Sequence, residues 1–161
     1  MIAITLPDGS IKKFEAGVTP MDVAKSISEG LARNVISAAF NGTTIETTTP
    51  LTQDGNLILF TWNDDEGKKA FWHSTSHVMA QALEELYPGI KLTIGPDIDN
   101  GFYYDIDFGD HAFSDKELKR VEDKMLEIAR GKYDFKMRSA SKAEALEFYK
   151  ENMSGGKVLV K

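Results

Sequence analysis

An uninterrupted stretch from Lys68 to Leu86, free of glycine and proline, constrains the fold of this chain more than any other feature. Its apolar residues recur at helical spacing and Tyr87-Pro88-Gly89 follows, so the stretch predicts one long helix that ends there. His73 and His77 lie four residues apart within it and therefore share one face of that helix. Two of the three histidines of the chain are thus brought together by local structure alone.

The residues before this helix predict a separate, β-rich domain over residues 1–62. A turn at Pro7-Asp8-Gly9-Ser10 separates two short strand patterns. Thr19-Pro20 begins a helix that we expect to end near Gly30, and Asn41-Gly42 marks a hairpin turn. The expected strands are 2–6, 11–14, 35–40 and 57–61. This order of elements is that of a ubiquitin-like β-grasp module, which at about 60 residues can fold alone.

The residues after the linker predict a second, α+β domain over residues 63–161. Strands at 91–96 and 102–108 read as a hairpin, and capping-box patterns at Ser114 and Ser141 open two further helices. Gly131 ends the first of these helices. Its expected inward residues are Leu118, Val121, Met125, Leu126 and Ile128. Further strands are expected at 133–138 and from Val158, where the chain stops, so we expect the natural chain to continue past Lys161.

The composition limits the function classes that fit this chain of 161 residues. It is 42 % hydrophobic and 27 % charged, a globular composition, and no apolar run approaches the roughly 20 residues that span a bilayer. No secretory signal pattern is present. With no cysteine the chain has no disulfide or thiolate zinc site, and its net charge of −6 does not itself indicate nucleic-acid binding.

The spacing of His73 and His77 leaves three interpretations open. Zinc-protease helices carry two histidines at this spacing, but they need a glutamate beside the first one, where this chain has Ser74. His111 is a possible third ligand with nothing to anchor it. The pair is otherwise a chance arrangement, or a pair of site histidines that position a water or a substrate near neutral pH.

Two other groups of residues have competing interpretations. A carboxylate cluster lies between residues 97 and 110, but it lacks the glycine and glutamate positions of an EF-hand, so solvated turn residues are favoured over a calcium site. Phe102, Tyr103 and Tyr104 can stack bases or pack in a core. A local basic region can contact phosphates or form a mixed solvated surface. The carboxylates are Asp97, Asp99, Asp105, Asp107 and Asp110, and the basic residues are Lys116, Lys119, Arg120, Lys124, Arg130, Lys132, Lys136 and Arg138.

The motifs in combination carry a family resemblance over essentially the whole chain. The segments 5–10, 19–24 and 35–42 resemble a TGS domain, the β-grasp module at the N-terminus of bacterial threonyl-tRNA synthetases. His73-Ser74-Thr75-Ser76-His77, Ile94-Gly95-Pro96 and the segment 99–105 are similar to the editing region that follows in that family. The related editing domain of alanyl-tRNA synthetases shares the HxxxH and GPxxxxGFYYD elements.

The resemblance implies a fold, a reaction and a site. The fold is α+β, with a TGS domain at 1–62 and the N-terminal part of an editing domain at 63–161. The reaction is hydrolysis of mischarged Ser-tRNA(Thr), and the matching site residues are His73, His77, Tyr104 and, on a later strand, Lys157. The family's Cys-x-x-x-His pair is expected beyond Lys161, so this piece should not edit unaided.

The resemblance also implies properties of a full-length parent, a cytoplasmic class II ligase that attaches threonine to tRNA(Thr). ATP, Mg and a zinc ion are expected in its aminoacylation core, with no cofactor or metal in residues 1–161. Its partners are the acceptor end of tRNA(Thr) and a second subunit, bound through the core, with no membrane contact. Two alternatives remain: an RNA- or ribosome-binding regulatory module with a TGS domain, and a stand-alone trans-editing hydrolase.

Overall fold

The structure, a computed structural model, describes residues 1–93, 95–133 and 139–152. The chain divides into two compact units, Met1–Phe71 and Trp72–Lys161, and the boundary between them falls inside the long helix α3 (Asp65–Leu86).

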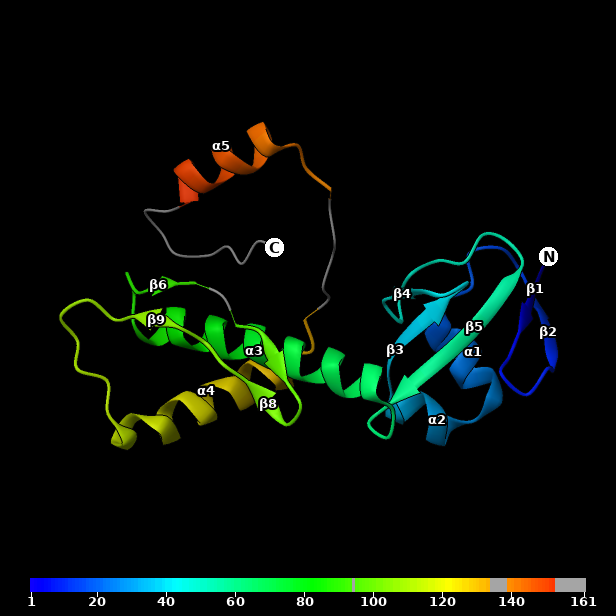
Figure 1. Ribbon diagram of the computed structural model, residues 1–161, viewed down its shortest axis with the longest axis horizontal. Coiled ribbons are helices and arrows are strands. Elements are labelled where there is room, and N and C mark those ends of the chain that lie inside the picture. Colours follow the sequence, from blue (N-terminus) through cyan, green and yellow to red (C-terminus); the bar gives the residue numbers. More distant parts are fainter. Residues whose placement is uncertain (94, 134–138, 153–161) are drawn as a thin grey trace. The chain divides into compact units, whose positions relative to one another are not determined.

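The first unit is built on a five-stranded sheet (Figure 1). Its strands lie in the spatial order β2-β1-β5-β3-β4. The parallel pairing of β1 with β5, the first and last strands, joins the two halves of the sheet at its centre, while the other neighbours are antiparallel. This topology confirms the predicted β-grasp fold. The strands are β1 (Ile2–Thr5), β2 (Ile11–Phe14), β3 (Val35–Phe40), β4 (Thr43–Ile45) and β5 (Gly55–Thr61).

The core of this unit lies on one face of the sheet. Alternate residues of a strand face opposite sides, so Ala38 and Leu57 point inward with Val23 of helix α1 (Pro20–Ile27). On the opposite face, Ile58 is 43 % exposed. Ser37 belongs to that face by register, yet it is buried and its hydroxyl has no hydrogen-bond partner. The structure offers no physical reason for this unpaired hydroxyl.

The helical segment of the first unit differs from the single helix that the sequence predicts. Thr19 caps the start of α1, as expected, and Asp22 completes a reciprocal capping box that was not predicted. Ser28 then adopts an extended conformation, and its hydroxyl accepts a hydrogen bond from the Leu31 amide at 3.0 Å, which starts a second helix, α2 (Glu29–Asn34). Gly30 lies inside α2, so its expected role as a helix terminator is wrong.

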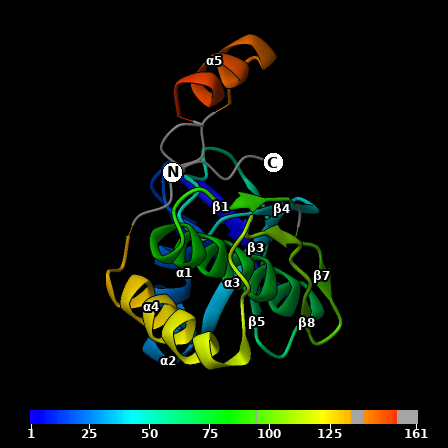
Figure 2. The ribbon, with the colours of Figure 1, turned by 90° about the vertical axis from the view of Figure 1, so that its left-hand side faces the viewer.

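The second unit contains the rest of α3, an irregular hairpin and further helices. The hairpin pairs β6 (Lys91–Leu92) with β9 (Ile106–Asp107) and β7 (Asp97–Ile98) with β8 (Gly101–Phe102). The register differs by one residue between the two pairs, so the predicted hairpin is confirmed but interrupted. Helix α4 (Leu118–Arg130), preceded by a 3-10 turn at Asp115–Glu117, runs beside α3 (Figures 1 and 2). Helix α5 is Lys142–Asn152.

The buried side of α4 is narrower than the sequence suggests. Val121 and Ile128, seven residues apart, are buried, whereas Leu118 is 55 % exposed and Leu126 is 44 % exposed. The expectation that Leu118 and Leu126 point inward is therefore wrong. A helix buries only the stripe that faces its neighbour; Leu126 lies outside that stripe, and Leu118 stands at the first position of the helix. The expected strands at 133–138 and from Val158 fall largely outside the described residues.

Candidate functional site

Helix α3 brings the two histidines together as their spacing predicts. The Nε2 atoms of His73 and His77 lie 2.9 Å apart, and the ring centroids are 4.5 Å apart with the rings nearly perpendicular. Ser76, between them in sequence, is buried and its hydroxyl donates to the His73 carbonyl at 2.7 Å. Ala80, one turn past Ser76, is fully buried. The pair therefore stands on a well-packed segment of the helix.

The distance between the two rings restricts their protonation. In a hydrogen bond between two Nε2 atoms, one nitrogen carries the hydrogen and the other supplies a lone pair. Two fully protonated imidazoles would direct N–H groups at each other, so this geometry holds at most one proton between the two nitrogens. Because both rings are only half-buried, a bound water or hydroxyl group can exchange into this hydrogen bond.

Tyr104 lies after β8, on the part of the hairpin that packs on α3. The hairpin contacts the helix through Phe102 and Trp72, whose ring centroids are 6.4 Å apart. Burial and the negative charge of Glu84 raise the pKa of the Tyr104 hydroxyl above its ordinary value of 10.0. The phenol is therefore neutral near pH 7 and can donate a hydrogen bond.

The fourth expected site residue, Lys157, falls outside the described residues. The structure thus brings His73 and His77 into contact on α3. It also places the Tyr104 hydroxyl near Glu84 of that helix, close enough for the carboxylate charge to raise its pKa. Glu84 follows His77 by seven residues, two helical turns, and so lies on the same side of α3. Glu84 was not predicted as a site residue, although its spacing from His77 is a signal for it.

The alternative metal sites find little support in the geometry. Within the described ranges, no three histidine, aspartate or glutamate side chains are placed to hold a metal ion together. Asp107 instead lies 3.6 Å from the Lys91 ammonium and accepts a hydrogen bond from the Gly109 amide at 2.8 Å. His111 lies 2.7 Å from the Glu117 carboxylate.

Much of the basic region on α4 is engaged in ion pairs. Lys119 pairs with Asp123 and Glu122, and Lys124 pairs with Glu85 of α3 at 2.9 Å. The Arg120 guanidinium lies over the Tyr87 ring, 5.7 Å from its centroid. These contacts favour the mixed solvated surface over a phosphate-binding patch for this part of the region.

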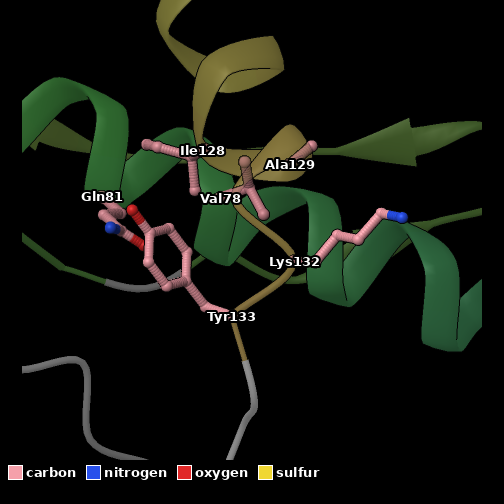
Figure 3. A pocket seen from close by; sticks show the side chains of 6 residues that line it. All are labelled: Val78, Gln81, Ile128, Ala129, Lys132 and Tyr133. Carbon is pink, nitrogen blue, oxygen red and sulfur yellow. The ribbon is translucent and has the colours of Figure 1, made fainter.

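A hollow of about 270 Å³ lies between α3 and the end of α4, one turn beyond His77 (Figure 3). The Tyr133 ring reaches toward Gln81, and the Lys132 chain extends away from them (Figure 3). The hollow is lined by Val78, Gln81, Ile128, Ala129, Lys132 and Tyr133.

Glu117, predicted only as part of a helix cap, lies at the centre of a cluster of hydrogen bonds. Its carboxylate accepts from the Tyr87 hydroxyl at 2.8 Å and from the Ser114 amide at 2.9 Å, and it lies against His111. These hydrogen bonds, led by that from Tyr87, lower the pKa of Glu117 from 4.5 to about 2. The carboxylate thereby joins the end of α3 to the start of α4.

Comparison with known proteins identifies the family of the first unit and a set of proteins similar to the chain as a whole. Residues 2–61 match the TGS domain family, which agrees with the five-stranded β-grasp sheet. The first unit is therefore a TGS domain. The chain is 76 % identical over 95 % of its length to a threonine–tRNA ligase of Flavobacterium johnsoniae, and 70 % identical over 94 % to one of Flavobacterium psychrophilum.

A third relative, the threonine–tRNA ligase of Cytophaga hutchinsonii, is 52 % identical over 92 % of the chain. The chain spans about a quarter of the length of these relatives, 23–24 % in each case. It is thus homologous to the N-terminal region of bacterial threonine–tRNA ligases, as the resemblance of its motifs predicts. None of the helices that the structure describes has both the length and the apolar character needed to cross a bilayer.

Proposed function

We propose that this chain is the N-terminal region of a threonine–tRNA ligase and that its second unit begins an editing domain that hydrolyses Ser-tRNA(Thr). The observation that carries the proposal is the 2.9 Å contact between His73 and His77, two half-buried imidazoles on a helix directly after a TGS domain. Homology to threonine–tRNA ligases along nearly the whole chain supports this reading over a regulatory RNA-binding module.

The chemistry of the amino acids explains why such an enzyme needs a second site. Serine lacks one methyl group of threonine, and binding discriminates such pairs by only ~1–3 kcal/mol. A threonine–tRNA ligase therefore gains accuracy by hydrolysing the ester bond of the wrong product. The reaction adds water across the bond between the seryl carbonyl and the 3′-terminal ribose, releasing serine and free tRNA.

The described residues have distinct roles in this proposal. His73 and His77 orient the attacking water and the terminal ribose, and the hydrogen bond between them holds one proton ready for transfer. Tyr104 donates a hydrogen bond to the serine side chain or the ester, and Lys157 contributes a positive charge. A Cys-x-x-x-His segment past Lys161 completes the pocket, so residues 1–161 do not edit by themselves.

The remaining parts of the proposal belong to the rest of the ligase. ATP, Mg²⁺ and a zinc ion serve the aminoacylation core, which lies outside residues 1–161. The core also forms the contact between two subunits. The acceptor end of tRNA(Thr) reaches both the aminoacylation site and the editing site. The ligase acts in the cytoplasm.

The test is deacylation of Ser-tRNA(Thr) by the full-length protein carrying His73→Ala. General acid–base groups contribute roughly 10²- to 10⁴-fold to rates, so we expect a fall in hydrolysis of that order. Charging of tRNA(Thr) with threonine should be unchanged in the same preparation. His111→Ala makes the same chemical change outside the pair and should leave hydrolysis intact. Unchanged hydrolysis by the His73→Ala protein would rule out the role proposed for the pair.

A further inference from the structure

The Tyr104 ring lies against the backbone at Gly95, on the opposite arm of the hairpin. A Cβ atom built on Gly95 would overlap Cδ2 of the ring, lie 2.7 Å from Cε2, and lie 3.0 Å from the Tyr103 carbonyl oxygen. Carbon atoms in contact prefer separations of about 3.5–4.0 Å, so the ring occupies the space that any side chain at position 95 would need.

Backbone conformation does not explain a glycine at this position. The glycines of the second unit with positive φ are Gly89, Gly101 and Gly109 among the residues described, and Gly95 is not one of them. At Gly101, φ is +151° and a Cβ would meet nothing within 4 Å, so glycine there serves the turn. At Gly95 the reverse holds: no positive φ requires a glycine, but the Tyr104 ring leaves no space for the methyl group of an alanine.

With its ring against Gly95, Tyr104 lies on the side of α3 that carries Glu84. The Tyr104 hydroxyl is close enough to Glu84 for the carboxylate charge to act on it. Glu84 is two turns from His77 and three from His73, so the three side chains share one side of the helix. The tyrosine ring thus lies against Gly95, and its hydroxyl lies near the side of the helix that carries the two histidines.

We propose that Gly95 is a positioning residue: the missing side chain lets one edge of the Tyr104 ring lie against the backbone and so directs its hydroxyl toward the side of α3 that carries His73 and His77. The inference rests on the proposed function, since Tyr104 has a role only there. It assigns to Gly95 a function that acts through Tyr104 and requires no contact with substrate.

The first experiment observes the ring itself in the 161-residue chain. Tyrosines labelled with ¹³C at Cζ are titrated by NMR, and Tyr104→Phe assigns the Tyr104 signal among the five tyrosines. In the original chain this signal should titrate above the ordinary tyrosine range, because the ring is buried near Glu84. Gly95→Ala should move its midpoint back toward 10. An unmoved midpoint in a folded Gly95→Ala chain would overturn the inference.

Gly30→Ala is the matched control for this titration. It makes the same change at a glycine that also lacks positive φ, on α2 of the first unit, where the nearest contact of a Cβ would be the Ser28 hydroxyl at 3.8 Å. It should leave the Tyr104 midpoint where it is in the original chain.

The second experiment measures hydrolysis of Ser-tRNA(Thr) by the full-length protein in a double-mutant cycle. Misplacement of a site group by about 1 Å can cost on the order of 10²-fold, so Gly95→Ala should slow hydrolysis by roughly 10- to 100-fold while threonylation stays normal. Tyr104→Phe removes the hydroxyl and keeps the ring. In that background Gly95→Ala should have little further effect.

The outcomes separate the two proposals. If Gly95→Ala slows hydrolysis equally in the original protein and in the Tyr104→Phe protein, the substitution damages the site in general. That result overturns the positioning role. Normal hydrolysis by the Gly95→Ala protein, with a shifted Tyr104 midpoint, overturns that role alone. Absence of hydrolysis in the unmodified full-length protein overturns the proposed function, and the positioning role with it, whatever the titration shows about packing.

Discussion

At the scale of single residues, Glu117 makes the stability of the second unit depend on pH. Its carboxylate collects hydrogen bonds from Tyr87, just after α3, and from His111 and Ser114 in the segment before the 3-10 turn, and its pKa falls from 4.5 to about 2. A lowered carboxyl pKa means that the folded state binds its proton less readily than the unfolded state. The stabilisation is therefore fully present above about pH 4.5 and is lost as the pH falls to about 2.

We accordingly predict that Glu117→Gln lowers the melting temperature near neutral pH and has a much smaller effect near pH 2. Glutamine keeps the shape of the side chain but cannot offer the same charged acceptors to Tyr87 and Ser114. Circular-dichroism melting curves at several pH values provide the measurement. If Glu117→Gln lowered the melting temperature by the same amount near pH 2 and near neutral pH, the pH dependence assigned to Glu117 would be wrong.

Much of the local structure was predictable at this scale because its causes are local. Thr19 caps α1 and the capping box at Ser114 forms, as predicted, and Asn41-Gly42 makes the expected turn with positive φ at both residues. The contact between His73 and His77 likewise follows from helical geometry. The fit of Tyr104 on Gly95 was not predictable, since it joins two arms of a hairpin whose register shifts by one residue between them.

At the scale of elements, the contact between α3 and α4 depends on a narrow stripe. Val121 and Ile128 are buried there, and the ion pair between Lys124 and Glu85 lies between them along the helix. A helix buries fewer positions than its apolar residues suggest, which is why Leu126, on another side of α4, was wrongly expected inside, while Leu118 is exposed at the start of the helix. The break at Ser28 was missed for a similar reason: a serine both ends one helix and caps the next only in this backbone context.

We predict that Ile128→Ala destabilises the second unit by about 2–5 kcal/mol, the usual cost of truncating a buried large aliphatic side chain. The matched control is Leu126→Ala, two positions away on the same helix, which should cost less than about 1 kcal/mol because that side chain is 44 % exposed. Urea denaturation of the two variants gives both values. Similar losses from both substitutions would contradict the proposed stripe.

At the scale of the whole molecule, the first unit has its own closed set of interactions. Its sheet joins the first strand to the last, and its core cluster draws only on residues before α3. Such a unit, of about 60–70 residues, is within the range that folds independently.

We therefore predict that Met1–Phe71 folds alone, with a dispersed amide NMR spectrum and a cooperative thermal transition. A chain that stops at Asp54 lacks β5, the strand between β1 and β3, and should be unfolded. A collapsed spectrum for Met1–Phe71 would contradict independent folding of the first unit, and a dispersed spectrum for the chain that stops at Asp54 would show that β5 does not have this central role.

The packing of the two tryptophans gives each unit an optical reporter of its own. Trp62 packs edge-to-face on Phe71 within the first unit, with ring centroids 5.0 Å apart, while Trp72 contacts Phe102 on the hairpin of the second. The chain contains no other tryptophan. Replacing either one by phenylalanine leaves an emission signal from a single unit. Fluorescence can then follow the TGS domain and the hairpin on α3 separately, in the same intact chain.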